Sequence, residues 1–224
     1  DAMMATITSD LAANRRYLIA FHEMNFVLVP NTQALVQINF DLPPEFYPGD
    51  SDPSPYPLPS NMPVESWPRE TGALTLSQWQ QDINGADSDR HAIVAQPGTG
   101  LLWEMWRAKY TNGIWRAGCG AKWDMNSNAQ RELGLTSADA AGLPMFGGLV
   151  RYDECQRGMV EHACRLVVKT TRGQYIYPAS HKTGSNTNTN RPAMGQRLRL
   201  KSDFVIPAGW SVSEKAVLKA MKKY

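Results

Sequence analysis

The sequence lacks any long hydrophobic run. No stretch approaches the roughly 18 consecutive apolar residues that predict a membrane-spanning helix. The opening residues, D-A-M-M-A-T-I-T, also lack the charged start and apolar centre of a signal peptide. We therefore expect no transmembrane segment, and we expect that an exported form has already lost its signal.

An excess of one charge is also missing. The chain carries 23 Lys and Arg against 21 Asp and Glu, which leaves a formal net charge of +2. A balance this even does not argue for nucleic acid or an anionic membrane as the main partner. From the whole-chain charge we therefore expect neither nucleic acid nor membrane binding.

Cysteine is scarce and odd in number. Cys119, Cys155 and Cys164 contain no C-x-x-C pair of the kind that holds zinc or performs thioredoxin-like chemistry. Either Cys155 and Cys164 bridge a short hairpin and leave Cys119 free, or all three are buried thiols. Cysteine does not settle the compartment, but in an exported protein we expect Cys155 and Cys164 to lie closer to each other than to Cys119.

Turn formers and aromatic residues are abundant instead. The 17 Gly, 15 Pro, seven Trp and eight Tyr, with 20% charged residues, are typical of a secreted β protein rather than a cytosolic helical one. A chain of 224 residues fits one large β domain. We predict a single domain over residues 1–224, all-β, with the antiparallel β-sandwich architecture of a jelly roll.

Alternating hydrophobicity and turn residues locate the expected elements. Strands are predicted at residues 17–21, 25–29, 34–40, 91–95, 101–109, 114–118, 161–170, 174–178 and 197–206. Helical turns are expected at 8–16, and a short helix or an irregular segment at 74–83. The capping box Ser211-x-x-Glu214 predicts a C-terminal helix over residues 211–222. The Pro-rich residues 41–69 and the polar residues 180–192 are predicted to be surface loops.

The stretch at residues 136–154 concentrates glycine, proline and charge. It places Asp139 in a turn of small residues, continues through the Gly/Pro segment 142–148, and ends in Arg151, Asp153 and Glu154. Glycines in such a segment serve backbone geometry, because only Gly adopts positive φ at little cost. The charged end is either a solvated turn or the rim of a site.

Paired carboxylates are the main chemical hypothesis, because glycoside hydrolysis needs one acid and one base or nucleophile across a groove. Glu104 is the best single candidate, since alternation places it among apolar residues of a strand, where its pKa would rise. Its candidate partners are Asp124, Asp139, Asp153 and Glu154, and Trp103, Trp106 and Trp123 suit stacking against sugar rings. The alternative is that Glu104 forms a salt bridge with a strand neighbour such as Arg116.

Three histidines form a second constellation. His91, His162 and His181 lack an H-x-H or H-E-x-x-H spacing, so metal binding is not favoured. His162 and His181 also suit general base and acid roles in a polysaccharide lyase. That chemistry would use Tyr175 or Tyr177, with the substrate carboxylate neutralised by Arg151 or Arg165. The Gly-x-Ser-x-Gly, P-loop and dinucleotide fingerprints are absent.

Long motifs link this chain to other proteins. They are S-A-D-A-A-G-L-P at 137–144, G-L-V-R-Y-D-E at 148–154, Y-P-A-x-H at 177–181 and M-G-x-R-L-R-L-K at 194–201. Over residues 50–224 the chain resembles a group of uncharacterised secreted bacterial proteins. The resemblance implies export and a shared fold. Members usually continue beyond the position of Tyr224, which implies that this chain is a trimmed or divergent version.

A shorter similarity concerns residues 101–106, L-L-W-E-M-W, which resemble the nucleophile strand of jelly-roll endoglucanases. There a Glu is flanked by apolar and aromatic residues, as Glu104 is here. The resemblance implies a nucleophilic role for Glu104.

The sequence therefore favours a carbohydrate-active enzyme, a glycoside hydrolase acting on a polysaccharide or oligosaccharide. A non-catalytic carbohydrate-binding module and a polysaccharide lyase are the alternatives, and no cofactor or metal is expected. We expect Glu104 and at least one of Asp139, Asp153 or Glu154 to meet His162 and His181 on one concave face, with Trp103, Trp106, Trp123, Arg151 and Tyr177 binding substrate.

Overall fold

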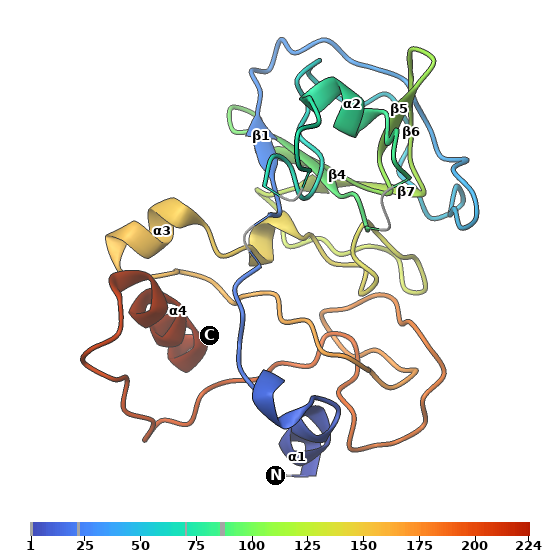
Figure 1. The fold of residues 1–224 in the computed structure, drawn as a ribbon. Coiled ribbons are helices and arrows are strands. Elements are labelled where there is room, and N and C mark those ends of the chain that lie inside the picture. The colour runs from blue at the N-terminus through green and yellow to red at the C-terminus, as the bar shows by residue number, and fades with distance from the viewer. Residues whose placement is uncertain (1, 22, 70, 86–87) are drawn as a thin grey trace. The chain divides into compact units, whose positions relative to one another are not determined.

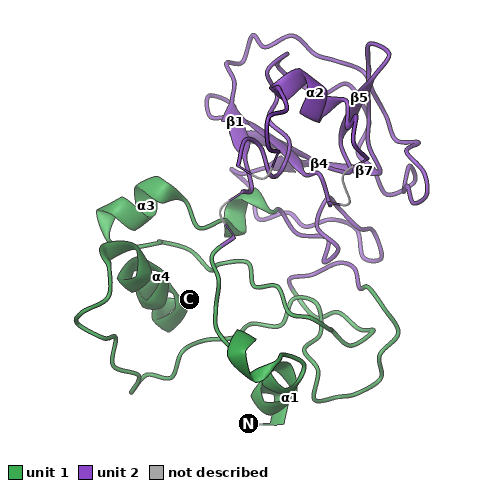
Figure 2. Ribbon diagram, in the orientation of Figure 1, with its two compact units in different colours: residues 1–20, 145–177, 183–224 green, residues 21–144, 178–182 purple. Residues whose placement is uncertain are grey.

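The computed structural model describes residues 2–21, 23–69, 71–85 and 88–224. Its chain divides into two compact units, coloured separately in Figure 2. Unit 1 comprises residues 1–20, 145–177 and 183–224, and unit 2 comprises residues 21–144 and 178–182. The single domain expected from the sequence stays a prediction. In the described ranges, no helix is both long and apolar enough to cross a membrane.

Unit 2 is built on a four-stranded sheet in the order β1-β3-β4-β7 (Figure 1). Its strands are β1 (Phe26–Leu28), β3 (Ala92–Gln96), β4 (Leu101–Trp106) and β7 (Cys119–Asp124). The predicted hairpin between β3 and β4 is confirmed, and β4 pairs antiparallel with β7. β1 runs parallel to β3, so the sheet is mixed and not purely antiparallel as the sequence predicted.

A second sheet contains three strands in the order β2-β6-β5: β2 (Ile38–Asn39), β5 (Lys109–Thr111) and β6 (Ile114–Arg116). β5 and β6 form a hairpin through Asn112 and Gly113, whose φ values of 53° and 81° suit a tight turn. β2 runs parallel to β6. The strand predicted over 101–109 is wrong in extent, because Arg107 at φ 57° breaks it between β4 and β5.

One apolar core of unit 2 contains residues from both sheets, among them Ile38, Val94, Met105 and Trp115. The Pro-rich stretch contributes to this core as well. Tyr56, Leu58, Met62 and Val64 are at most 3% exposed. The prediction of a surface loop over 41–69 is therefore wrong for its second half, since the apolar residues between the prolines are buried. α2 (Leu76–Gln80) follows and begins with a capping box formed by Thr75 and Gln78.

Unit 1 is mostly helical and irregular. Its helices are α1 (Ala2–Ser9), α3 (Tyr152–Arg157) and α4 (Val212–Lys223), with short 3-10 turns η1 (Ala13–Arg15) and η2 (Phe146–Gly148). The predicted C-terminal helix is confirmed, with the Ser211–Glu214 capping box in place. α3 and α4 share a small apolar cluster of Cys155, Val160, Ala216 and Ala220. The charged end of the 136–154 stretch thus begins a helix, with Asp153 and Glu154 in the first turn of α3.

The strands predicted in unit 1 are wrong. Residues 161–170, 174–178 and 197–206 contain no strand, although Tyr175 and Met194 form an isolated bridge, and residues 17–21 are also irregular. The reason is visible at 197–206, where α4 takes the place of a partner strand. Leu200 donates its backbone N–H to Met221, and the Lys222 ammonium donates to the carbonyls of Ser202 and Phe204. Alternation alone does not make a strand when no sheet edge pairs with it.

Candidate functional site

A pocket of about 350 Å³ lies in unit 2 at the end of β7. It is lined by the last residues of β7, by the polar loop that follows and by one residue of the Pro-rich stretch. These residues are Asp52, Lys122, Trp123, Asp124, Ala129, Gln130, Arg131, Glu132 and Leu135. The wall combines one indole ring with three carboxyl groups and two basic groups.

The three residues of β7 that line the pocket differ in how far they are exposed. Lys122 pairs with Trp103, and Trp123 pairs with Leu102. Successive residues of a strand point to opposite faces. Lys122 and Asp124 are exposed, whereas Trp123 is only 8% exposed. Only a small part of the packed Trp123 ring is therefore exposed to the pocket, and the ring does not form an open aromatic platform.

Arg131 is the most constrained charged group of the pocket, with 7% of its side chain exposed. Its guanidinium pairs with the Asp52 carboxylate, donates to the backbone carbonyl of Asp50, and lies 5.6 Å from the centroid of the Trp123 ring. The backbone N–H of Lys122 donates to the same Asp52 carboxylate at 2.7 Å. The Arg131 charge thus balances that of the Asp52 carboxylate. Through these two contacts, Asp52 links the polar loop that follows β7 to β7 itself.

The other two carboxylates of the pocket are held differently. Asp124 Oδ1 accepts hydrogen bonds from the backbone N–H and the side-chain amide of Asn126, at 2.9 and 3.0 Å. Glu132 is exposed on the loop. Asp124 was a predicted partner of Glu104, whereas Asp52, Lys122, Arg131 and Glu132 were not predicted as site residues.

Glu104 lies behind the pocket and is not one of its lining residues. It is 0% exposed, in the middle of β4, opposite Ile93 of β3 and Ala121 of β7. The prediction that it sits in an apolar strand environment is confirmed. The indole Nε1–H of Trp123 donates to Glu104 Oε2 at 3.3 Å, so Glu104 contacts the pocket through that ring. Arg116, the alternative salt-bridge partner, pairs with Asp41 at 2.8 Å.

The other two predicted tryptophans have different surroundings. Trp103 belongs to the apolar core and has the Lys122 ammonium 5.6 Å from its ring centroid. Trp106 donates its indole N–H to Asp89 at 3.1 Å. Neither is a lining residue of the pocket, so of the three predicted tryptophans Trp123 alone lines it.

Asp139 and His181 lie in a second polar part of unit 2, where residues 178–182 pack on residues 134–142. Asp139 is buried and accepts a hydrogen bond from the backbone of Ala141 at 3.3 Å. His181 Nδ1 lies 2.9 Å from the Ala140 carbonyl. Because a carbonyl only accepts, this contact places the proton on Nδ1 and leaves Nε2 as an acceptor when the ring is neutral.

Gly142 shows why this segment needs its glycines. Its φ is +69°, and a Cβ there would lie 1.9 Å from Ser180 Oγ and 2.9 Å from the Leu135 carbonyl. The Ser180 hydroxyl donates to the carbonyls of Leu135 and Gly142, which holds residues 178–182 in place. The close approach of these backbones is possible only without a side chain at position 142.

Glu154 and His162 meet in unit 1. His162 Nε2 lies 3.1 Å from Glu154 Oε2, and Arg151 donates to Glu154 Oε1 at 2.9 Å. His162 Nδ1 lies 3.0 Å from the Ala163 carbonyl, so both ring nitrogens face oxygen atoms that only accept. The ring can donate to both of them only when both nitrogens carry a proton. Burial raises the pKa of Glu154, but the hydrogen bond from His162 and the Arg151 charge outweigh it and keep this pKa below its ordinary value. Since Glu154 is buried, the group is an ion-pair cluster rather than a solvated turn.

The remaining predicted residues of unit 1 do not join this cluster through their described contacts. Asp153 pairs with Arg157 one helical turn away at 2.6 Å, and this hydrogen bond lowers the pKa of Asp153. Tyr177 is 81% exposed. Glu104, Asp139 and His181 belong to unit 2, whereas Asp153, Glu154 and His162 belong to unit 1. The convergence of all of them on one face stays a prediction.

The three cysteines and His91 were also considered in the sequence, and their contacts indicate structural roles. All three cysteines are free thiols. Cys155 and Cys164 pack in the same cluster of unit 1, and Cys119 is buried in β7. His91 is buried, with Nδ1 3.3 Å from the Met105 carbonyl.

Within the part of the chain that the structure describes, no group of three or more His, Cys, Asp or Glu is placed to hold a metal ion.

Comparison with known proteins gives no relative from which to assign these residues. No protein-family model, no curated protein and no solved structure matches the chain.

Proposed function

We propose that unit 2 binds a saccharide in the pocket beside Trp123. The observation that carries the proposal is the composition of the pocket wall: three carboxyl groups, Lys122, Arg131 and an amide surround part of one indole ring. Sugar hydroxyls both donate and accept hydrogen bonds, while the C–H groups of a sugar ring pack on apolar surface. A volume of about 350 Å³ lies at the small end of ligand pockets, which suits a short saccharide segment.

The pocket is also pre-organised. Asp52 and Arg131 fix each other, and Asn126 fixes Asp124. The Trp123 ring is held from behind by its hydrogen bond to Glu104. A ligand that meets donors and acceptors already in position does not have to order them, which favours affinity.

Binding is tested by glycan-array retention followed by calorimetric titration of the retained oligosaccharide. We expect Glu132→Ala and Lys122→Met each to weaken binding by about tenfold, since each removes a hydrogen bond to a charged group. Glu45→Ala is the matched control, because Glu45 is an exposed carboxylate of unit 2 outside the pocket wall. An empty array, or equal affinity in all variants, would contradict the proposal.

Hydrolysis is the second candidate function, favoured because Asp124 and Glu132 line the same pocket. Glycoside hydrolysis requires two carboxyl groups on either side of the scissile bond. Glu104 then acts through the Trp123 ring as a positioning residue. Asp124→Asn and Glu132→Gln should stop the release of reducing ends while Asp124→Asn retains glycan binding. Absorbance from an unsaturated product would indicate a lyase instead, and binding without any product would leave a binding module.

Two broader proposals accompany this one. We propose that the two sheets of unit 2 pack as a distorted sandwich related to the jelly roll, which is supported by the apolar core that their residues share. We also propose an extracellular bacterial setting, where polysaccharides are accessible. This proposal is supported by the Gly-, Pro- and Trp-rich composition and by the resemblance to secreted proteins.

A further inference from the structure

The net charge of +2 conceals a separation of charge between the two units. Unit 1 contains 15 Lys and Arg against seven Asp and Glu, a formal charge of +8, while unit 2 contains eight against 14, a formal charge of −6. Within unit 1, residues 197–224 contain seven basic and two acidic residues. The expectation that charge does not direct this protein to a partner was drawn from the whole-chain charge, which averages two units of opposite formal charge.

The same segment exposes apolar side chains. In the segment of residues 201–212, a loop that ends at the first residue of α4 (Figure 1), Phe204 is 38% exposed, Val205 83%, Trp210 44% and Val212 57%. Single exposed apolar residues are ordinary, but four within 12 residues of chain concentrate apolar surface in one segment, which favours an interaction site. The exposed Arg199 and Lys201 lie at its start.

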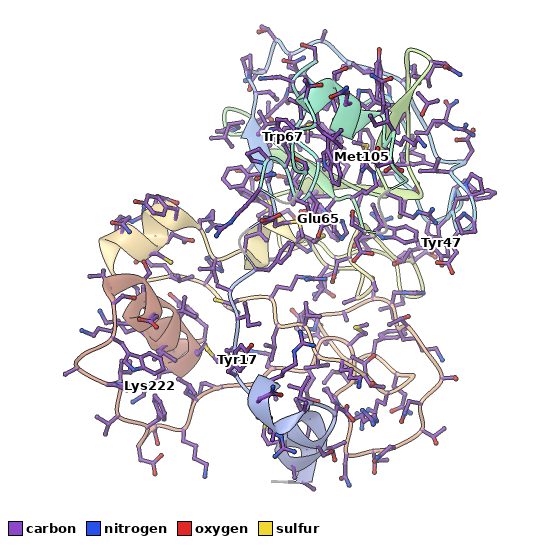
Figure 3. The ribbon with its side chains drawn as sticks, viewed as in Figure 1. Tyr17, Tyr47, Glu65, Trp67, Met105 and Lys222 are labelled. Atoms are coloured by element: carbon purple, nitrogen blue, oxygen red, sulfur yellow. The ribbon has the colours of Figure 1, made fainter. Side chains whose placement is uncertain are left out.

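α4 holds this loop in place. Lys222, labelled in Figure 3, donates from Nζ to the carbonyls of Ser202 and Phe204, each at 2.8 Å. The backbone N–H of Phe204 closes a turn on Lys201, and that of Trp210 closes a turn on Pro207. The apolar side chains are therefore presented by an anchored loop.

We propose that the 201–212 loop and its basic neighbours dock on the surface of an anionic lipid bilayer. Phe204, Val205 and Val212 gain free energy when they leave water for the acyl boundary, and Trp side chains favour the membrane interface. Arg199, Lys201 and Lys223 attract anionic headgroups. Nucleic acid or an acidic polysaccharide would use the basic groups, but it would leave the two valines in water. The loop belongs to unit 1 and the pocket to unit 2, and they share no residue.

The first experiment is co-sedimentation of the full chain with vesicles of phosphatidylcholine alone, or of phosphatidylcholine mixed with phosphatidylglycerol. We expect binding to the mixed vesicles, weakened by salt, and little binding to the neutral ones. Arg199→Gln and Lys201→Gln should each weaken binding by about fivefold, corresponding to about 1 kcal/mol per basic residue. No binding to the anionic vesicles, or equal binding to both kinds, would overturn the proposal.

The second experiment separates insertion from charge. The double variant Val205→Ser/Trp210→Ser keeps every charge and should lose at least about tenfold in affinity for the anionic vesicles. Val167→Ser is the matched control, since Val167 is 71% exposed in unit 1 outside the loop, and it should bind as the parent does. All variants change exposed side chains, so an unchanged melting temperature verifies folding. If instead the loop substitutions abolish self-association in solution and leave vesicle sedimentation unchanged, the loop contacts a second copy and the lipid proposal is wrong.

Discussion

Units 1 and 2 form the hydrogen bonds of their backbones in different ways. In unit 2 the ladders between β1, β3, β4 and β7 pair backbone with backbone. The elements that the structure describes in unit 1 are helices, without such ladders. Basic side chains donate to backbone carbonyls in both units, as Arg90, Arg107 and Arg131 do in unit 2. Lys169, Arg172, Arg197, Lys219 and Lys222 each donate to a backbone carbonyl. Donation to backbone carbonyls is therefore common to basic residues of both units, and in unit 1 it occurs beside helices and irregular chain rather than beside strand ladders.

The two units also differ in what pH does to their groups. The carboxyl groups with lowered pKa values are, among the described residues, Asp10, Asp153, Glu154 and Glu214, all of unit 1, where hydrogen bonds favour the charged form. In unit 2, burial raises the pKa of the Cys119 thiol to about 11 and also raises that of Tyr56. Burial also raises the pKa values of the Cys155 and Cys164 thiols in unit 1, so the contrast between the units lies in the carboxyl groups with lowered pKa values.

The largest expected effect lies in the core of unit 2. Met105 is 1% exposed in β4, in the core shared by both sheets and labelled in Figure 3. Met105→Ala should lower the free energy of unfolding by about 2–5 kcal/mol, because it removes buried atoms and leaves a cavity. Urea denaturation measures this. Val167→Ala in unit 1 is the control and should change stability by less than about 0.5 kcal/mol; a large effect there would remove the contrast between the units.

A smaller loss is expected at Gly142. Gly142→Ala forces a left-handed φ of +69° on a residue with a Cβ and drives that atom into Ser180. We expect a loss of about 2–4 kcal/mol, from strain together with overpacking. In thermal unfolding, the double variant Gly142→Ala/Ser180→Gly should regain the stability lost to overpacking but not the stability lost to backbone strain. Full additivity of the two substitutions would show that the contact is unimportant.

Local signals account for the elements that the sequence predicted correctly. The Asn112-Gly113 turn, the β3–β4 hairpin and the Ser211–Glu214 capping box are each specified by a few adjacent residues. The burial of Glu104 followed from alternation in the same way. These features depend on chemistry within a few residues of chain, so a single sequence is enough to find them.

Long-range pairings account for what the sequence missed. Arg131 meets Asp52 across 79 positions, and no local pattern marks either residue. Tertiary structure also decides the parallel pairs β1–β3 and β2–β6. It likewise decides that residues 197–206 pack on α4 and not on a partner strand. Of the residues that line the pocket, the sequence therefore predicted only Trp123 and Asp124.

Acid should weaken unit 1 through Glu154. A carboxyl whose pKa is lowered in the folded state stabilises it above the ordinary value of 4.5, and this stability is lost as the pH falls below that value. Glu154→Gln should lower stability at neutral pH by about 1.5–3 kcal/mol and flatten the dependence below pH 4.5, as measured by urea denaturation at each pH. Glu161→Gln, an exposed neighbour, should behave as the parent does. An equally steep acid dependence in Glu154→Gln would assign it to other carboxyls.

The smallest expected effect tests whether the two units form one domain. Each unit has a helix with a capping box: Thr75 caps α2 in unit 2, and Ser211 caps α4 in unit 1. Thr75→Ala and Ser211→Ala should each cost about 1 kcal/mol, because each leaves a helix N–H without its acceptor. In calorimetry a single cooperative domain shows one transition, which both substitutions shift downward. If Thr75→Ala shifts one transition and Ser211→Ala another, the units unfold separately and the single domain predicted from the sequence is wrong. We expect the single transition, because the chain passes between the units at residues 20–21, 144–145, 177–178 and 182–183, so neither unit is a continuous segment.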